Sequence, residues 1–95
     1  MLSIVANPEG NVVHIHGDVS GLLALEREIR RLREHAEQGS CQDGHLFTQA
    51  WGGVDLTETM LDNERGEGWH QVHHVKLFSW SAEWSTRHGL SPAVP

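Results

Sequence analysis

The chain has very little cysteine: Cys41 is the only one among 95 residues. A single cysteine cannot form an internal disulfide, and it cannot supply a cysteine-built metal site. We therefore expect a protein of a reducing compartment, the cytoplasm, in which Cys41 is a loop residue without a chemical role.

Long apolar runs are also missing. No segment approaches the ~20 consecutive apolar residues that a membrane-spanning helix needs, and the first residues lack the basic and apolar stretches of a secretory signal. Hydrophobic residues make up 38% of the chain and charged residues 21%, which is ordinary for a globular protein. We expect one domain over residues 1–95, with residues 89–95 frayed.

Catalytic motifs are missing as well. The sequence contains no GxSxG turn, no HExxH zinc motif and no glycine-rich phosphate loop in front of a helix. We therefore predict that the protein is not an enzyme and that it needs no cofactor.

Eight histidines are the remaining candidates for metal chemistry. His14 and His16 would share one face of a strand, and His70 and His74 one face of another. Such pairs could bind zinc or nickel, but no carboxylate or cysteine stands at ligand spacing beside them. We predict no metal site and interpret the histidines as polar residues on a wet sheet face. A His-rich metal- or small-ligand-binding domain is the alternative.

The sequence does contain one long amphipathic helix pattern, from about Ser20 to Gln38. Apolar residues recur there in steps of three and four, which gives the stripe that a helix packs against a core. Asp18 or Ser20 can cap its start, and Gly39 can end it in a left-handed conformation. We expect the whole stripe to be buried against a sheet. Its members are Leu22, Leu25, Ile29, Leu32 and Ala36.

The charge of the chain is unevenly placed. The formal net charge is −6, but the glutamates and arginines of the helix interleave and balance one another. This alternation indicates a solvated helix face and not a nucleic-acid site. The acidic excess lies between Asp43 and Glu67, where it would favour basic protein partners or would serve solubility alone.

The remainder of the chain indicates short strands, in the overall order β-β-α-β-β-β. A turn over residues 7–11 would join the first two strands into a hairpin, and we expect a loop over residues 61–68 and a helical turn over residues 81–88. The pattern predicts an α+β fold, an antiparallel sheet of about four to five strands with one long helix packed on one face. The expected strands cover residues 2–6, 12–16, 45–51, 54–59 and 69–80.

Two of these strands carry large apolar side chains on both faces. Alternation would place Leu46, Ala50, Val75 and Leu77 on one face, and Phe47, Trp51, Val72, Phe78 and Trp80 on the other. One helix covers only one face, so the second needs its own cover. The C-terminal segment with Trp84 could fold back over it, a partner could cover it, or a bulge could switch the strand's parity.

We predict a protein contact on this second face. Tryptophan is enriched at interface hot spots, although packing within the fold would explain each tryptophan equally well. The partner would be another protein or a second copy of the chain, and not a nucleic acid or a membrane. The predicted binding residues are Phe47, Trp51, Phe78 and Trp80, flanked by the acidic Asp55 and Glu58.

Three short segments carry a resemblance to a known family. They are Val13-His14-Ile15-His16-Gly17-Asp18 with the helix stripe that follows, His45-Leu46-Phe47, and Val72-His73-His74-Val75-Lys76-Leu77-Phe78-Ser79-Trp80. Together they resemble the Imm32-type immunity proteins of bacterial polymorphic toxin systems over roughly residues 12–80.

The resemblance implies a small cytoplasmic α+β protein that binds and neutralises a cognate toxin. It implies no catalytic residues, and it transfers no toxin-contacting residue to this chain. It therefore makes an immunity protein the predicted function. The alternatives are the His-rich ligand-binding domain and a structural dimerisation subunit.

Overall fold

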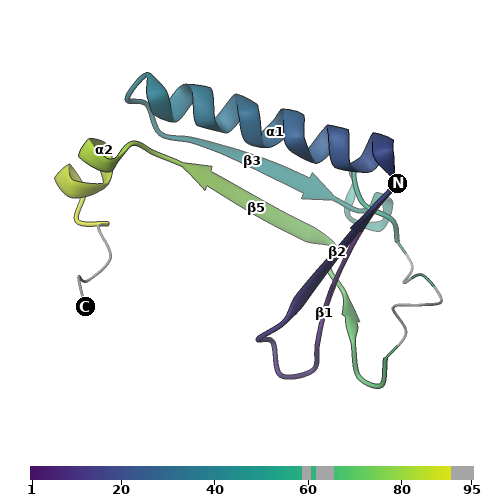
Figure 1. Cartoon of the computed structure of the whole chain (residues 1–95). Coiled ribbons are helices and arrows are strands. Elements are labelled where there is room, and N and C mark those ends of the chain that lie inside the picture. Colours follow the sequence, from purple (N-terminus) through teal and green to yellow (C-terminus); the bar gives the residue numbers. More distant parts are fainter. Residues whose placement is uncertain (59–60, 62–65, 91–95) are drawn as a thin grey trace.

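The computed structural model describes residues 1–58, 61 and 66–90, and it has α+β architecture with antiparallel sheets, as predicted (Figure 1). One long helix lies along a pair of strands, and a separate hairpin crosses the end of that pair. The elements are β1 (Leu2–Ala6), β2 (Val13–Gly17), α1 (Val19–Glu37), β3 (Gln42–Phe47), the 3-10 turn η1 (Gln49–Trp51), β4 (His70–Gln71), β5 (His74–Ser79) and α2 (Ala82–Arg87).

The strands form a three-stranded sheet in the order β2-β1-β4 and a two-stranded sheet of β3 and β5, all antiparallel. Only Val72 and His73 separate β4 from β5. The Val72 N–H donates to the Ile4 carbonyl of β1 at 2.8 Å, and the His73 carbonyl accepts from the Thr48 N–H at 3.0 Å. Successive strand residues direct their backbone groups to opposite edges, so β1 and β3 flank opposite edges of this stretch. The two sheets therefore meet at Val72 and His73 and bend there.

The expected single strand over residues 69–80 is thus two strands, because β1 follows the chain only as far as Val72. The strand expected over residues 45–51 is also wrong. The structure places β3 over Gln42–Phe47 and turns the following residues into η1, which ends at Gly52 with φ 92°.

The strand expected over residues 54–59 does not form in its described part, residues 54–58, and Thr59 lies outside the described residues. The Asp55 and Leu56 N–H groups both donate to the Phe47 carbonyl at 3.1 Å, so this segment wraps the end of β3. Leu56 makes one isolated bridge with Thr48. Of the expected loop over residues 61–68, residues 62–65 lie outside the description, as do residues 91–95 of the expected frayed end.

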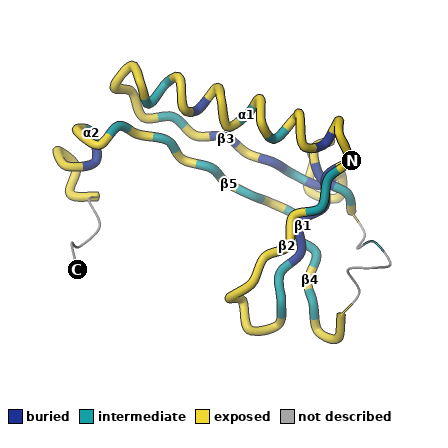
Figure 2. The backbone as a smooth tube through the Cα atoms, in the orientation of Figure 1, coloured by how far each residue is buried: buried dark blue, intermediate teal, exposed yellow. Residues whose placement is uncertain are grey.

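The core is small and lies where α1, β1 and β3 meet (Figure 2). Leu2, Ile4, Leu46 and Leu56 form a buried cluster, and Leu25, Val72, Val75 and Leu77 pack against it partly exposed. Leu32 is also buried, with 4% of its surface exposed. None of the described helices is long and apolar enough to cross a membrane.

The capping residues of α1 behave as the sequence predicts. Asp18 is the N-cap, and its Oδ1 accepts from the Gly21 N–H at 2.8 Å. At the other end Gly39 takes φ 82°, and its N–H donates to the Ala36 carbonyl at 3.0 Å. These contacts satisfy backbone groups that a helix end leaves without partners within the helix.

Asp18 should make stability depend on pH below pH 4. Its carboxylate accepts from the Met1 ammonium at 2.6 Å, and this bond, with those from the Gly21 amide and the Ser20 hydroxyl, lowers its pKa from 3.8 to about 2. A lowered folded-state pKa gives stability that is present above the unfolded pKa and is lost as pH falls through the folded value. In Asp18→Asn, which keeps a capping oxygen, the melting temperature at pH 7 should fall and its decline between pH 4 and pH 2 should become shallower. If the melting temperature of Asp18→Asn declines between pH 4 and pH 2 as steeply as that of the wild type, Asp18 is not the source of this pH dependence.

The helix stripe is only partly buried, and here the sequence prediction is wrong. Leu25 and Leu32 face the core, but Leu22 and Ile29 are each 49% exposed. Glu28 and Arg31 form an ion pair at 2.6 Å, and Arg31 Nη2 donates to the Asp43 carbonyl of β3 at 3.0 Å. That flank of α1 therefore lies over β3. Leu22 lies against Gly17 of β2 near the start of the helix. Ile29 lies on the flank opposite Arg31, toward β5, where no further described strand supports it.

Candidate functional site

The residues of β3 and β5 that point away from α1 form an open face. On β5 the burial alternates strictly between exposed and half-buried residues, with Val75 and Leu77 toward the helix. On β3, Leu46 is buried toward the helix, and the register pairs it with Val75. This alternation confirms the two-faced sheet predicted from the sequence. The open face consists of Asp43, His45, Phe47, His74, Lys76 and Phe78.

Stacked rings run along one half of the open face. The Phe47 and His74 rings are 4.3 Å apart between centroids and 14° from parallel, and the His45 and His74 rings are 5.1 Å apart and 17° from parallel. His45 Nδ1 and His74 Nε2 also share a hydrogen bond of 2.9 Å. The three side chains therefore form one continuous ring stack across both strands.

Charged groups hold the middle of the face. The Lys76 ammonium lies 4.7 Å from the centroid of the Phe78 ring and 3.7 Å from Asp43 Oδ2. The same carboxylate oxygen lies 3.8 Å from His45 Nε2. Exposed ion pairs of this kind contribute only ~0–1 kcal/mol each. They order the surface and contribute little to the stability of the fold.

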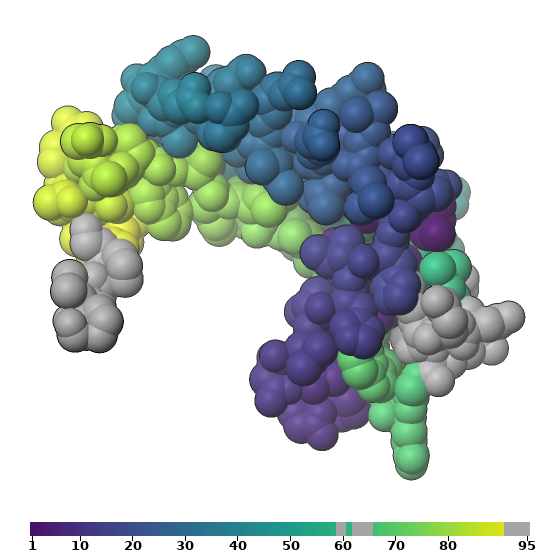
Figure 3. All heavy atoms as spheres, in the orientation of Figure 1, coloured from purple at the N-terminus to yellow at the C-terminus, as the bar shows by residue number. Residues whose placement is uncertain are grey.

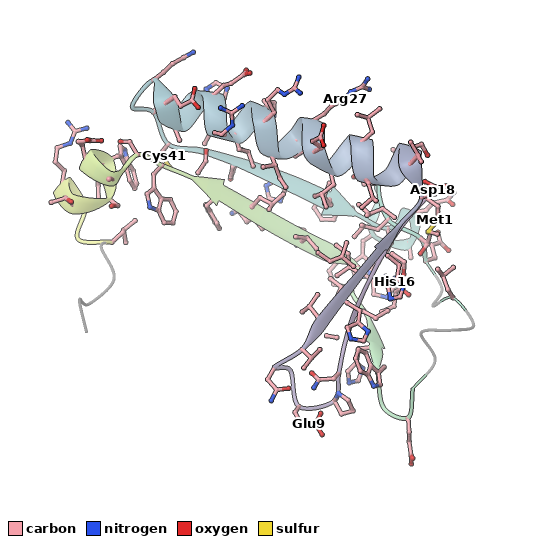
Figure 4. The ribbon with its side chains drawn as sticks, viewed as in Figure 1. Met1, Glu9, His16, Asp18, Arg27 and Cys41 are labelled. Carbon is pink, nitrogen blue, oxygen red and sulfur yellow. The ribbon has the colours of Figure 1, made fainter. Side chains whose placement is uncertain are left out.

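Two tryptophans extend the face beyond the end of β5. The Trp80 ring lies 6.3 Å from Phe78 and 6.0 Å from Trp84, and Trp84 stacks on His88 at 3.9 Å. α2 begins at this point because the Ser81 hydroxyl accepts from the Trp84 N–H at 3.1 Å. Figure 4 shows this short helix at the far end of the strand pair from the hairpin.

The C-terminal segment does not fold back over the open face within the described residues, which end at Leu90. α2 continues outward past the end of β5 (Figure 1), and Phe78 remains 56% exposed and Trp80 39% exposed. A bulge within β5 is also absent, since its register with β3 and its alternation are unbroken. Nothing in the described chain covers this face.

The structure brings together some of the residues predicted to bind. Phe47 and Phe78 lie on the open face, and Trp80 follows at its end. Asp55 lies beside it, since its Oδ2 accepts from the Phe47 N–H at 3.2 Å. Glu58 is exposed, with no contact that ties it to this face.

Trp51 does not share the open face, which corrects the sequence interpretation. It belongs to η1, is 59% exposed, and stacks on the His73 ring at 5.6 Å. The expected strand alternation does not apply at this residue because the strand ends at Phe47. Conversely, His45, His74 and Lys76 were missed as members of the face, although the alternation that identified Phe78 could have included them.

His14 and His16 share one face of a strand, as the sequence pattern predicts, but His70 and His74 lie on two different strands. His14 and His16 share β2 with ring centroids 5.9 Å apart, and His14 packs on Trp69 at 4.6 Å. His74 pairs with His45 of β3 instead. Among the described residues, no group of three or more His, Cys, Asp or Glu side chains is placed to hold a metal ion.

Zinc or nickel should therefore leave the melting temperature nearly unchanged. A metal at 100-fold excess over its dissociation constant would stabilise the fold by ~2.7 kcal/mol, a shift that a thermal melt detects easily. The His45–His74 pair offers only two imidazole ligands, and a closed structural zinc site needs four ligands. A large upward shift that His74→Ala abolishes would contradict this expectation and would favour the ligand-binding alternative.

A shallow hollow of about 260 Å³ adjoins the open face, lined by Cys41, Gln42, Asp43 and Phe78. Small-molecule sites are generally enclosed clefts of ~300–1,000 Å³. This hollow is smaller and open to solvent, so the extended face is the stronger candidate for function.

Comparison with protein-family models, with curated proteins and with solved structures gives no match for this chain.

Proposed function

We propose that this chain is a non-catalytic protein-binding module that binds its partner through the open face of β3 and β5. One observation carries the proposal. A continuous row of aromatic, imidazole and cationic side chains lies on a two-stranded sheet, and none of the described residues covers it.

The energetics support a binding role for this face. An isolated pair of strands is marginally stable in water, and exposed aromatic patches in folded proteins mark contact sites. Phe78 and Trp80 are exposed, and each contacts a neighbouring ring or cation on the same surface. Anchors that are already ordered lose less conformational entropy on binding, which is why such residues dominate interface affinity.

The kind of partner follows from charge and from the resemblance. The chain carries a formal charge of −6, and Asp43 and Asp55 lie on or beside the open face. Lys76 pairs with Asp43 on the face itself, so the preference for a basic protein surface comes from Asp55 and from the net charge of the chain. We propose an immunity protein that neutralises a cognate bacterial toxin in the cytoplasm, because the Imm32-type resemblance includes the strands that make this face.

The experiment is to co-express the chain with the protein encoded by the immediately upstream gene, and to measure both survival of the host cell and affinity by calorimetry. Phe78→Ala and Trp80→Ala should each weaken binding at least ~30-fold, the effect of losing a hot spot of about 2 kcal/mol. Both substitutions lie outside the buried core, so the fold should persist.

Trp51→Ala is the matched control, since Trp51 is an exposed tryptophan that does not lie on the open face. It should leave affinity within a few-fold of the wild type. If Trp51→Ala abolishes binding while Trp80→Ala does not, the open face is not the binding site. A metabolic enzyme encoded upstream, with no binding and no protection, would overturn the immunity role.

A further inference from the structure

We propose that two copies of this chain pair through the free edges of their β5 strands, forming a continuous sheet in the order β3-β5-β5-β3 with both α1 helices on one face. The surface used is the edge of β5 and the helix flank above it. Lys76 and Phe78 of the open face also lie on this strand, but the inference rests on the strand edge and the helix flank and not on the partner assigned to the open face.

The edge itself is the first observation. β5 pairs with β3 along one side, and none of the described strands pairs with its other side. Just before β5 in the sequence, β1 lies along this same side, up to the hydrogen bond between Val72 and Ile4. The free edge therefore continues a side of the sheet that already accepts a strand. An unprotected edge of this kind is a template for another strand.

The molecule is more extended than a compact chain of its length. Its radius of gyration is 15.5 Å, against ~13 Å for a compact chain of about this length. Its accessible surface is 6581 Å², roughly 1,100 Å² more than the ~5,500 Å² expected from its mass. A standard interface buries ~800 Å² per partner. Figure 3 shows the cause, a hollow below the strand pair between α2 and the β1–β2 hairpin.

The spacing of the helices fits a second copy. α1 lies over both β3 and β5, so in the four-stranded sheet the two helix axes would be two strand spacings apart, ~10 Å. Helices pack at 8–10 Å. The side chain between them would be Ile29, which is half exposed on the flank toward β5. The second helix would bury the part of the stripe that the single chain leaves in water.

The side chains of β5 favour a two-fold axis at Leu77 over one at Lys76. A two-fold axis at Lys76 would oppose two like charges, which destabilises a strand pair. An axis at Leu77 places Lys76 of one copy opposite Phe78 of the other, and Val75 opposite Ser79. Residues paired across this axis are both odd-numbered or both even-numbered, so their side chains point to the same side of the sheet. Both α1 helices therefore lie on one face. The Lys76–Phe78 contact seen within one strand would recur between strands.

The test is the mass of the full chain in solution by sedimentation equilibrium. We expect about 21 kDa at micromolar concentration, twice the 10.6 kDa of one chain. Ile29→Lys should weaken association ~100-fold, since it places two charges between the helices. Leu23→Lys is the matched control: Leu23 is 41% exposed on the same helix but about a third of a turn away, and it should leave the dimer intact.

Phe78→Lys provides a second variant that does not touch the helix packing, so circular dichroism should show the wild-type fold. It should dissociate the dimer, because Lys76 would then face a lysine of the other copy. Hydrogen exchange should show amides of β5 protected in the wild type and faster in both dissociated variants. A wild-type monomer, or dimers unaffected by Ile29→Lys and Phe78→Lys, would overturn the proposal. Phe78 also belongs to the open face, so both variants are compared by the mass of the isolated chain, where partner binding plays no part.

Discussion

Replacing Leu32 by alanine should lower the free energy of unfolding by about 2–5 kcal/mol. Leu32 is 4% exposed and lies on the part of α1 that faces the core. With a core this small, such a loss is a large share of the ~5–15 kcal/mol that stabilises a typical domain. Urea denaturation followed by circular dichroism measures it.

Leu23→Ala is the control for this substitution, because it removes the same atoms from an exposed site on the same helix. It should change stability by less than ~1.5 kcal/mol, since 41% of this side chain is exposed. Ile29→Ala, measured in dilute solution where a dimer dissociates, should cost less than ~1.5 kcal/mol, since half of this side chain is already in water. Equal losses at Leu32 and Ile29 would show that the whole stripe is buried and that the helix sits differently on the sheet.

Gly21→Ala should destabilise the protein although helix propensity favours it. Alanine is better than glycine in a helix interior by ~1 kcal/mol. A Cβ at this position, however, would lie 1.9 Å from the Met1 carbonyl oxygen. The terminal residue cannot simply move away, because that carbonyl accepts from the Asp18 N–H at 3.1 Å and the Met1 ammonium binds the Asp18 carboxylate.

Overpacking of this kind costs ~1–3 kcal/mol, so we expect a net loss of stability in thermal and urea denaturation. Helix propensity and overpacking change the stability in opposite directions, so the direction of the measured change shows which of them dominates. A higher melting temperature in Gly21→Ala would mean that propensity decides at this position and that the N-terminal contact with α1 is weak.

The predictions that succeeded from sequence rest on local rules. The start of α1 at Asp18 and its end at Gly39 follow from capping chemistry, which involves only neighbouring residues. The opposition of Phe78 to Leu77 on β5 follows from the two-residue period of a strand. The overall α+β class follows from the change along the chain between the 3.6-residue period of a helix and the two-residue period of a strand.

The predictions that failed concern where a strand ends. Strand alternation predicts that Trp51 and Ala50 point to opposite faces only if the strand continues past Phe47. The structure begins η1 there instead. The turn is closed by the Trp51 and Gly53 N–H groups, which donate to the Thr48 carbonyl at 3.0 and 2.9 Å. Asp55 and Leu56 then return to the Phe47 carbonyl, a contact that the strand pattern of residues 45–51 does not encode. A strand's length is set by its partners, and the partner of β3 is β5, a strand far along the chain.

The sequence by itself determined that this chain would form a long amphipathic helix and a sheet with large apolar side chains on both faces, because those features depend on the spacing of side chains along a regular backbone. Only the tertiary structure decided how much of each face is covered. The sheet under α1 is two strands wide, so Leu32 is buried while Ile29 remains half exposed. The same packing brings His45 against His74 and orders the row that ends at Trp80. Burial and side-chain pairing depend on segments far apart in the chain, and residue spacing alone does not specify which segments meet.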